Sequence, residues 1–217
     1  LLDIEGTTTS IAFVYDVLFP YAREHVGAFV ADHWEKLDAE RDLFAAEDGP
    51  VDSPQALEAR VLAQMDADQK TTGLKALQGR IWKEGYAQGT LLADVFDDVP
   101  RAMRAWKEAG KSICIYSSGS VAAQKLLFGH THYGDLKPLI SGYFDTTTGP
   151  KRSAASYHRI AAAMDLSPPS ILFATDVAAE ADAAAAAGMQ VVIMDRPGNR
   201  PQPAHPHRVL VDFDALL

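Results

Sequence analysis

The sequence is poor in the features that mark secreted, membrane-spanning and nucleic-acid-binding proteins. Its one cysteine, Cys114, lies in an apolar run and cannot form a disulfide within the chain, so a reducing cytoplasm is the expected compartment. No apolar run approaches the ~18 residues of a membrane-spanning helix, and no signal peptide is expected at the start. Positive charge is also scarce. The formal net charge of −9 argues against nucleic acid, which requires clustered Lys and Arg.

What is present suffices for a substantial core. Hydrophobic residues make up 47% of the 217 positions, which suits one large domain or a domain with an insertion. Only Leu1 and Leu2 precede Asp3, whereas an average strand has about five or six residues, so we expect a few native residues ahead of Leu1. Since no long apolar stripe is left unassigned, we expect a monomer.

The stretch from residue 14 to residue 95 has helical spacing and no persuasive strand. Apolar residues recur close to every 3.6 positions over residues 14–34, and Pro20 within this run predicts a kink or two helices in sequence. Further on, Ser53 and Pro54 have the residue types of a helix N-cap and a first helical position. The stretch therefore predicts an all-helical unit.

The remainder of the chain alternates between strand and helix patterns. Predicted strands at residues 112–116, 142–144, 171–174, 191–194 and 209–211 alternate with predicted helices at residues 99–109, 121–128, 153–164 and 178–187. Such alternation favours βα units on a parallel sheet, and the apolar pair before Asp3 is typical of the end of another strand. The predicted fold class is α/β. We expect a sheet-bearing catalytic core of residues 1–13 and 97–217, and a helical insertion of residues 14–96.

Polar side chains suited to phosphate chemistry follow three of the predicted strands. Asp3 follows the first, Ser117 and Ser118 follow the second, and Asp176 follows the third. Because the carboxyl ends of parallel strands lie at one edge of the sheet, these groups should converge. Lys151, in the loop before a helix, can reach the same edge.

Charge assigns a role to each group. Asp3 would attack phosphorus, and a hard cation such as Mg²⁺, held by Asp3 and Asp176, would offset the repulsion. Ser117 and nearby backbone N–H groups would bind phosphate oxygens, and Lys151 would balance the negative charge. Glu5 either acts as acid or base, or offers its backbone carbonyl to the metal; the spacing leaves both open.

Each of these residues also has a purely structural interpretation. Ser117 and Ser118 suit a helix cap, Lys151 suits a solvated surface, and Asp176 suits an N-cap. Glu180 and Asp182, on the first turns of the following helix, favour the helix dipole and need do no more. The order of the four groups along the chain and their positions at strand ends favour the chemical interpretation.

The same residues resemble the four motifs of the haloacid dehalogenase (HAD) superfamily of phosphatases. Longer segments resemble one family within it, the acireductone synthases, which are the enolase-phosphatases of methionine salvage. The resemblance covers nearly the whole chain and is weakest around residues 38–56. The segments that carry it are DIEGTTTSIAF at 3–13, LFPY at 18–21, IYSSGSVAAQKLLFG at 115–129 and RPGN at 196–199.

The resemblance implies a Rossmann-like core with an all-helical cap, one Mg²⁺ per subunit, and two reactions on one substrate. The diketone 2,3-diketo-5-methylthiopentyl 1-phosphate is enolised and then dephosphorylated to the acireductone 1,2-dihydroxy-3-keto-5-methylthiopentene. By position, Asp3 is nucleophile and metal ligand and Asp176 is a metal ligand. Ser117, Ser118 and Lys151 bind the phosphate, and Lys151 also balances charge in catalysis.

The chain departs from the usual superfamily pattern at one position, where Glu5 replaces a second Asp. The longer side chain fits the enolase-phosphatase branch, and Glu5 is the candidate acid or base for enolisation as well as a candidate metal ligand. In the cap, Trp82 and Tyr86 are candidates for holding the methylthio end of the substrate. For Trp82, the alternative role as a residue of the cap's own core is at least as well founded.

Two other functions fit part of the pattern. A general small-molecule phosphatase of the same superfamily would use the same four groups without the enolisation step. A non-enzymatic receiver-type phosphoacceptor also combines an Asp, a hydroxyl and a Lys on a parallel sheet. The helical insertion and Glu5 after Asp3 argue against the receiver.

Overall fold

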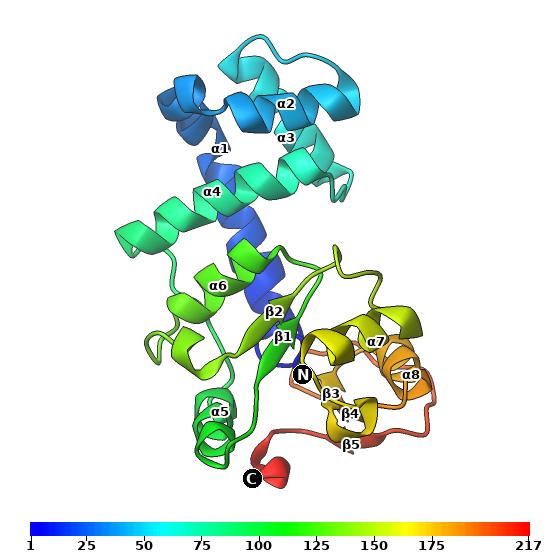
Figure 1. Ribbon diagram of the computed structural model, residues 1–217. Coiled ribbons are helices and arrows are strands. Elements are labelled where there is room, and N and C mark those ends of the chain that lie inside the picture. The colour runs from blue at the N-terminus through cyan, green and yellow to red at the C-terminus, as the bar shows by residue number, and fades with distance from the viewer. The chain divides into compact units, whose positions relative to one another are not determined.

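The computed structural model describes all residues from 1 to 217 and divides into two compact units (Figure 1). The core unit comprises Leu1–Val14 and Leu92–Leu217, and the helical unit comprises Tyr15–Leu91. None of the helices combines the length and apolar character needed to cross a membrane.

A parallel sheet organises the core unit. Its strands are β1 (Cys114–Tyr116), β2 (Gly142–Phe144), β3 (Leu172–Thr175), β4 (Gln190–Met194) and β5 (Arg208–Leu210), and the pairs β1–β2, β3–β4 and β4–β5 are all parallel. Leu2 bridges Ile115 of β1 and Ala174 of β3, in parallel with both. The segment that leads to Asp3 therefore occupies the centre of the sheet.

Helices α5 (Asp98–Glu108), α6 (Val121–Gly129), α7 (Ala154–Ala163) and α8 (Ala178–Ala186) belong to this unit. Tyr157 of α7 packs its ring against Tyr116 and Phe173, at centroid separations of 5.6 and 5.2 Å. From α8 only small side chains, such as Ala183 and Ala184, enter the same buried cluster, so this helix can pack closely against the sheet.

The helical unit has its own core. A π-helical segment, Phe13–Leu18, leads into α1 (Phe19–His33), and a 3₁₀ turn, Trp34–Lys36, follows. The other helices are α2 (Asp38–Asp48), α3 (Pro54–Asp66) and α4 (Thr72–Gln88). The side chains that fill this core come from all four helices, among them Val26, Phe44, Leu57 and Leu77.

Several helix boundaries confirm the sequence predictions. The Ser53 hydroxyl accepts a hydrogen bond from the N–H of Ala56 at 3.2 Å, so Ser53 is the N-cap of α3. The run across Pro20 is divided, but Pro20 lies in the first turn of α1, where its missing N–H costs no hydrogen bond. Helix α2 has no counterpart among the predictions, and Phe44 is its only buried residue.

Candidate active site

Parallel pairing brings the predicted strand ends to one edge of the sheet. Asp3 continues the central segment, Ser117 follows β1 and Asp176 follows β3, and these are neighbouring positions because Leu2 bridges both strands. Asp3, Ser117 and Asp176 are all buried. The convergence predicted from strand order is therefore present in the fold.

Three donors orient the Asp3 carboxylate. Its Oδ1 accepts hydrogen bonds from the N–H of Ile4 at 2.7 Å and from Nζ of Lys151 at 2.7 Å. Its Oδ2 accepts a hydrogen bond from the Thr175 hydroxyl at 3.2 Å. The side chain is 7% exposed, so the carboxylate is held in one orientation inside the protein.

Lys151 is an internal cation and not a surface lysine. Its Nζ lies 2.7 Å from Asp3 Oδ1 and 2.6 Å from Glu180 Oε2. Burial opposes the charged form of Lys151, but attraction to these two carboxylates outweighs it and raises the pKa of the ammonium. Tyr157 fixes the backbone at this position by donating its hydroxyl to the Lys151 carbonyl at 2.7 Å.

Glu180 belongs to the site, which the sequence reasoning missed when it gave this residue only a dipole role. Besides pairing with Lys151, Glu180 Oε2 accepts the Thr175 hydroxyl at 3.0 Å. Burial, followed by repulsion from Asp3, raises the pKa of the Glu180 carboxyl. Its position in the sequence could have indicated this role. Glu180 comes four residues after Asp176, on the first turn of a helix that begins at a strand end.

Asp176 carries an unfavourable charge. Burial, together with repulsion from Asp3 and Glu180, raises its pKa to about 7. The residue is not the N-cap of α8, because Val177 holds that position and no side chain caps the helix. The structural interpretation of Asp176 is therefore wrong.

Gly6 allows the chain to pass close to this carboxylate. Its φ is +64°, and a Cβ there would lie 2.5 Å from Asp176 Oδ2 and 2.8 Å from Asn199 Oδ1. Both the backbone conformation and the lack of space require glycine. The turn after Asp3 is thus pressed directly against Asp176.

The serines after β1 differ from one another. The buried Ser117 hydroxyl accepts the N–H of Gly119 at 3.2 Å, whereas Ser118 is exposed. Ser120 caps α6 by accepting the N–H of Ala123 at 3.2 Å. The helix-cap interpretation of Ser117 and Ser118 is therefore wrong.

The predicted metal ligands do not form a three-side-chain cluster. No group of three or more His, Cys, Asp or Glu side chains is arranged to hold a metal, and Glu5 lies half-buried in the turn, where its backbone bridges Thr9. The charges of the site nevertheless suit a divalent cation, because Asp3, Asp176 and Glu180 face a single ammonium, Lys151. Mg²⁺ commonly takes only one or two carboxylates and completes its shell with water and phosphate oxygens.

In the helical unit, the two residues predicted to hold the methylthio group lie among core contacts. The Trp82 indole N–H donates to the Leu18 carbonyl at 2.8 Å, and its ring lies beside Phe19 at 6.2 Å. Tyr86 is 5% exposed. These contacts are those of core residues.

Known proteins share this fold and sequence. The chain matches the haloacid dehalogenase-like hydrolase family over residues 1–188. It is 50% identical to the enolase-phosphatase E1 of Thioalkalivibrio sulfidiphilus over 216 residues, which cover 98% of this chain and 96% of that protein. The enolase-phosphatase E1 of Drosophila melanogaster is 48% identical over 216 residues, covering 92% of this chain and 83% of that protein.

Solved structures agree. The UTR4 protein of Saccharomyces cerevisiae superposes with a TM-score of 0.85 at 35% identity, covering 98% of this chain and 96% of that one. CbbY from Rhodobacter sphaeroides superposes with a TM-score of 0.65 at 16% identity, covering 100% and 94%, which supports the fold alone. Identity of about one half along nearly the whole length means that this chain is an enzyme of the enolase-phosphatase E1 family, within the haloacid dehalogenase-like hydrolases.

Proposed function

We propose that this enzyme converts 2,3-diketo-5-methylthiopentyl 1-phosphate into the acireductone 1,2-dihydroxy-3-keto-5-methylthiopentene and phosphate, as a step of methionine salvage. The substrate is the one implied by the family resemblance. The observation that carries the chemistry is the buried ion pair of Asp3 and Lys151 at the carboxyl ends of the strands. A carboxylate fixed by three donors, one of which is a buried ammonium, is suited to attack on phosphorus.

In the phosphatase step, a carboxylate oxygen of Asp3 forms a bond to phosphorus while the bond from phosphorus to the substrate oxygen breaks. The leaving oxygen keeps the electron pair and takes a proton from Glu5, which gained that proton as the base in the enolisation. Water then hydrolyses the aspartyl phosphate and restores Asp3. Lys151 balances the charge of Asp3 and the phosphate throughout, and Ser117 binds the phosphate with Ser118.

Asp3 and Asp176 would hold one Mg²⁺, with Glu5 contributing either its side chain or its carbonyl. When bound, the ion offsets the repulsion between the nucleophile and the phosphate. The raised pKa of Asp176, which reflects its burial and repulsion from the carboxylates of Asp3 and Glu180, supports a cation at this place.

Enolisation requires a base near the carbon that loses its proton, and we assign this role to Glu5. Glu5→Gln should then abolish both phosphate release and the exchange of solvent deuterium into the substrate. If the variant still exchanges deuterium but releases no phosphate, another group is the base.

The decisive experiment follows two products in one sample containing the protein, Mg²⁺ and the diketone phosphate. Phosphate release and the ultraviolet absorbance of the conjugated enediol should rise together, and Asp3→Asn should give neither. Phosphate without enediol would make the protein a general phosphatase of the superfamily. If the wild type forms neither phosphate nor enediol, the proposal is overturned.

We propose a cytoplasmic monomer whose only partner is the small phosphorylated substrate, with the helical insertion serving as the specificity domain. Light scattering should then give a mass close to the chain's 23.5 kDa, and a multiple of that value would contradict the monomer.

A further inference from the structure

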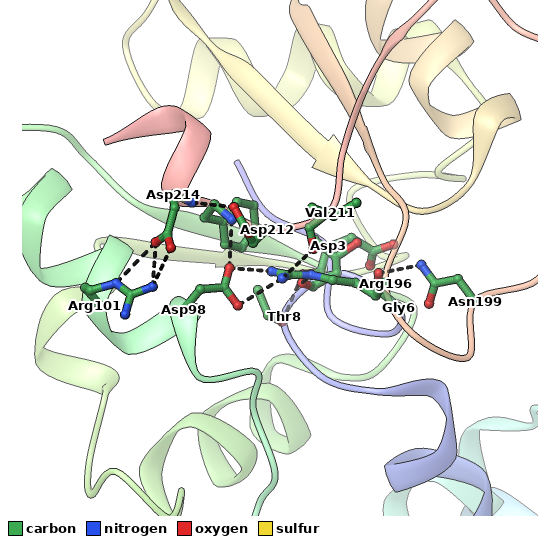
Figure 2. Close-up of polar contacts among 12 residues, drawn as sticks. Asp3, Gly6, Thr8, Asp98, Arg101, Arg196, Asn199, Val211, Asp212 and Asp214 are labelled. Atoms are coloured by element: carbon green, nitrogen blue, oxygen red, sulfur yellow. Dashed lines mark hydrogen bonds and ion pairs between the residues drawn. The ribbon is translucent and has the colours of Figure 1, made fainter.

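The turn from Arg196 to Asn199, which follows β4, has no role in the chemistry above. Figure 2 shows its two polar side chains directed toward the loop that follows Asp3. Arg196 is 4% exposed, although arginine is rarely buried without partners. The contacts of Arg196 and Asn199 show what this turn holds.

Asp98 pairs with Arg196 through both oxygens. The two guanidinium nitrogens lie 2.9 and 2.8 Å from Asp98 Oδ1 and Oδ2 (Figure 2). The guanidinium also stacks between Phe96 and Phe213, at 4.5 and 4.9 Å from the ring centroids. Asp98 Oδ2 accepts the N–H of Phe213 at 2.7 Å as well. The pair is therefore fully engaged and its orientation is fixed.

Two further donors of the turn bind successive carbonyls of the loop after Asp3, while Arg196 Nη1 also donates to the Val211 carbonyl at 3.0 Å. Arg196 Nε donates to the Thr7 carbonyl at 3.1 Å. Asn199 Nδ2 donates to the Gly6 carbonyl at 2.8 Å and to the Met194 carbonyl at 3.0 Å. Two side chains of one turn thus bind two neighbouring peptide groups.

Each of these peptide groups is also held from its other side. The Ile4 carbonyl accepts the N–H groups of Thr7, Thr8 and Thr9 at 3.2, 2.9 and 3.0 Å. A peptide group is planar, so fixing its C=O and its N–H fixes the whole plane. Asn199 and Ile4 fix the Gly6–Thr7 plane, and Arg196 and Ile4 fix the Thr7–Thr8 plane. The Thr8 hydroxyl then donates to the Asp3 carbonyl at 3.1 Å, which joins this loop to Asp3 itself.

We propose that Arg196 and Asn199 are positioning residues, which set the geometry of the nucleophile by holding the carbonyls of Thr7 and Gly6. The proposal rests on the proposed role of Asp3. Neither side chain needs to touch the substrate. Loss of either contact frees a peptide plane within four residues of the attacking carboxylate, and misplacement by ~1 Å can cost about 10²-fold in rate.

Arg196→Lys is the central test, because lysine keeps the charge opposite Asp98 but cannot bond both Asp98 oxygens and Thr7 together. A matched control lies on α5, the helix that carries Asp98. Arg101, also on α5, binds Asp214 through both carboxylate oxygens at 2.6 Å, is exposed and touches no residue of the loop (Figure 2). Arg101→Lys makes the same chemical change away from the nucleophile.

With the diketone phosphate as probe, kcat of Arg196→Lys should fall ~10- to 100-fold while KM stays within about threefold. Asn199→Ala should likewise lower kcat while KM stays nearly unchanged. Arg101→Lys should keep the wild-type kcat and KM. The melting temperature and the folded fraction of each variant are measured alongside, and kcat is expressed per folded molecule.

Wild-type kcat in Arg196→Lys, or a loss fully accounted for by unfolded protein, would overturn the proposal. If Arg196→Lys does not fold, Asn199→Ala decides, since Asn199 lies near the surface. Asp3→Asn distinguishes failure of the positioning role from failure of the proposed function. If that variant is inactive while Arg196→Lys and Asn199→Ala are normal, only the positioning role fails; if it is active, the proposed function fails.

Discussion

At the scale of single residues, Lys151 has the most demanding surroundings, because two buried carboxylates share its ammonium. Lys151→Gln removes this cation and should lower kcat by ~10²-fold or more, since Lys151 is the ammonium that pairs with both Asp3 and Glu180. Lys137→Gln is the control, because Lys137 forms a comparable but exposed pair with Asp135 at 3.5 Å. Steady-state phosphate release measures both. Near-normal turnover in Lys151→Gln would contradict the assigned role.

Gly6 and Gly134 allow crowding to be separated from backbone strain. Both have positive φ, +64° and +84°, but a Cβ at Gly6 would strike Asp176 whereas one at Gly134 would meet nothing within 4 Å. Gly134→Ala should cost about 1 kcal/mol of unfolding free energy and leave kcat unchanged. Gly6→Ala should cost about 2 to 4 kcal/mol and at least tenfold in kcat. Urea unfolding measures the loss of unfolding free energy, and phosphate release measures the loss of kcat. Equal losses in the two variants would show that a Cβ at Gly6 is not crowded by Asp176.

The raised pKa of Asp176 predicts that the folded protein loses stability as the pH rises. In the folded protein the pKa is about 7, against an ordinary value of 3.8. Ionisation therefore destabilises the fold increasingly as the pH rises from 4, and the penalty is complete above 7. In EDTA, Asp176→Asn should melt higher than wild type at pH 8, and the difference should shrink toward pH 4.

Added Mg²⁺ provides the control for this measurement. It should stabilise the wild type and leave Asp176→Asn largely unchanged, because a ligand stabilises only the state that binds it. A variant that melts below the wild type at pH 8 in EDTA would show that the Asp176 charge is compensated in the metal-free protein.

Position along the strands was enough to find Asp3, Ser117, Lys151 and Asp176 as candidate residues. The Arg196–Asp98 pair could not be found in this way. Arg196 and Asp98 are separated by 98 positions, and no spacing rule joins them. Such partners are set by how strands and helices pack, so a pattern read along one chain does not contain them.

At the scale of elements, α8 depends on having small residues on one face. Ala184 is fully buried against the sheet, and Ala185, next along the helix, is exposed. Ala184→Leu should cost about 1 to 3 kcal/mol of unfolding free energy through overpacking, and Ala185→Leu should be nearly neutral. Urea unfolding tests the pair. Equal stability of the two variants would mean that the core accommodates larger side chains at this helix.

The predicted strands and most helices are confirmed because apolar periodicity and cap residues mark them locally. The parallel order of the sheet followed from the alternation of strands and helices. Helix α2 was missed for the converse reason. Only one of its side chains, Phe44, is buried, so the sequence offers a single apolar core position, and the helix packs against α4.

At the scale of the whole molecule, two separate cores predict two unfolding events. Leu77 is fully buried in the helical unit and Phe173 is fully buried in the core unit. In calorimetry, Leu77→Ala should lower the temperature of one transition and Phe173→Ala that of the other, each by several degrees. A single transition shifted equally by both variants would show that the units unfold together.

The central position of Leu2 and Asp3 in the sheet has a consequence for synthesis of the protein. Asp3 bonds to Thr175, which is 172 positions later in the chain. At about 5 to 20 residues per second, a ribosome takes roughly 10 to 35 s to supply that partner. The helical unit, whose contacts lie within residues 15–91, can fold during this interval. The nucleophile is thus translated before the rest of its site, and the phosphatase becomes competent only after β3 has left the ribosome.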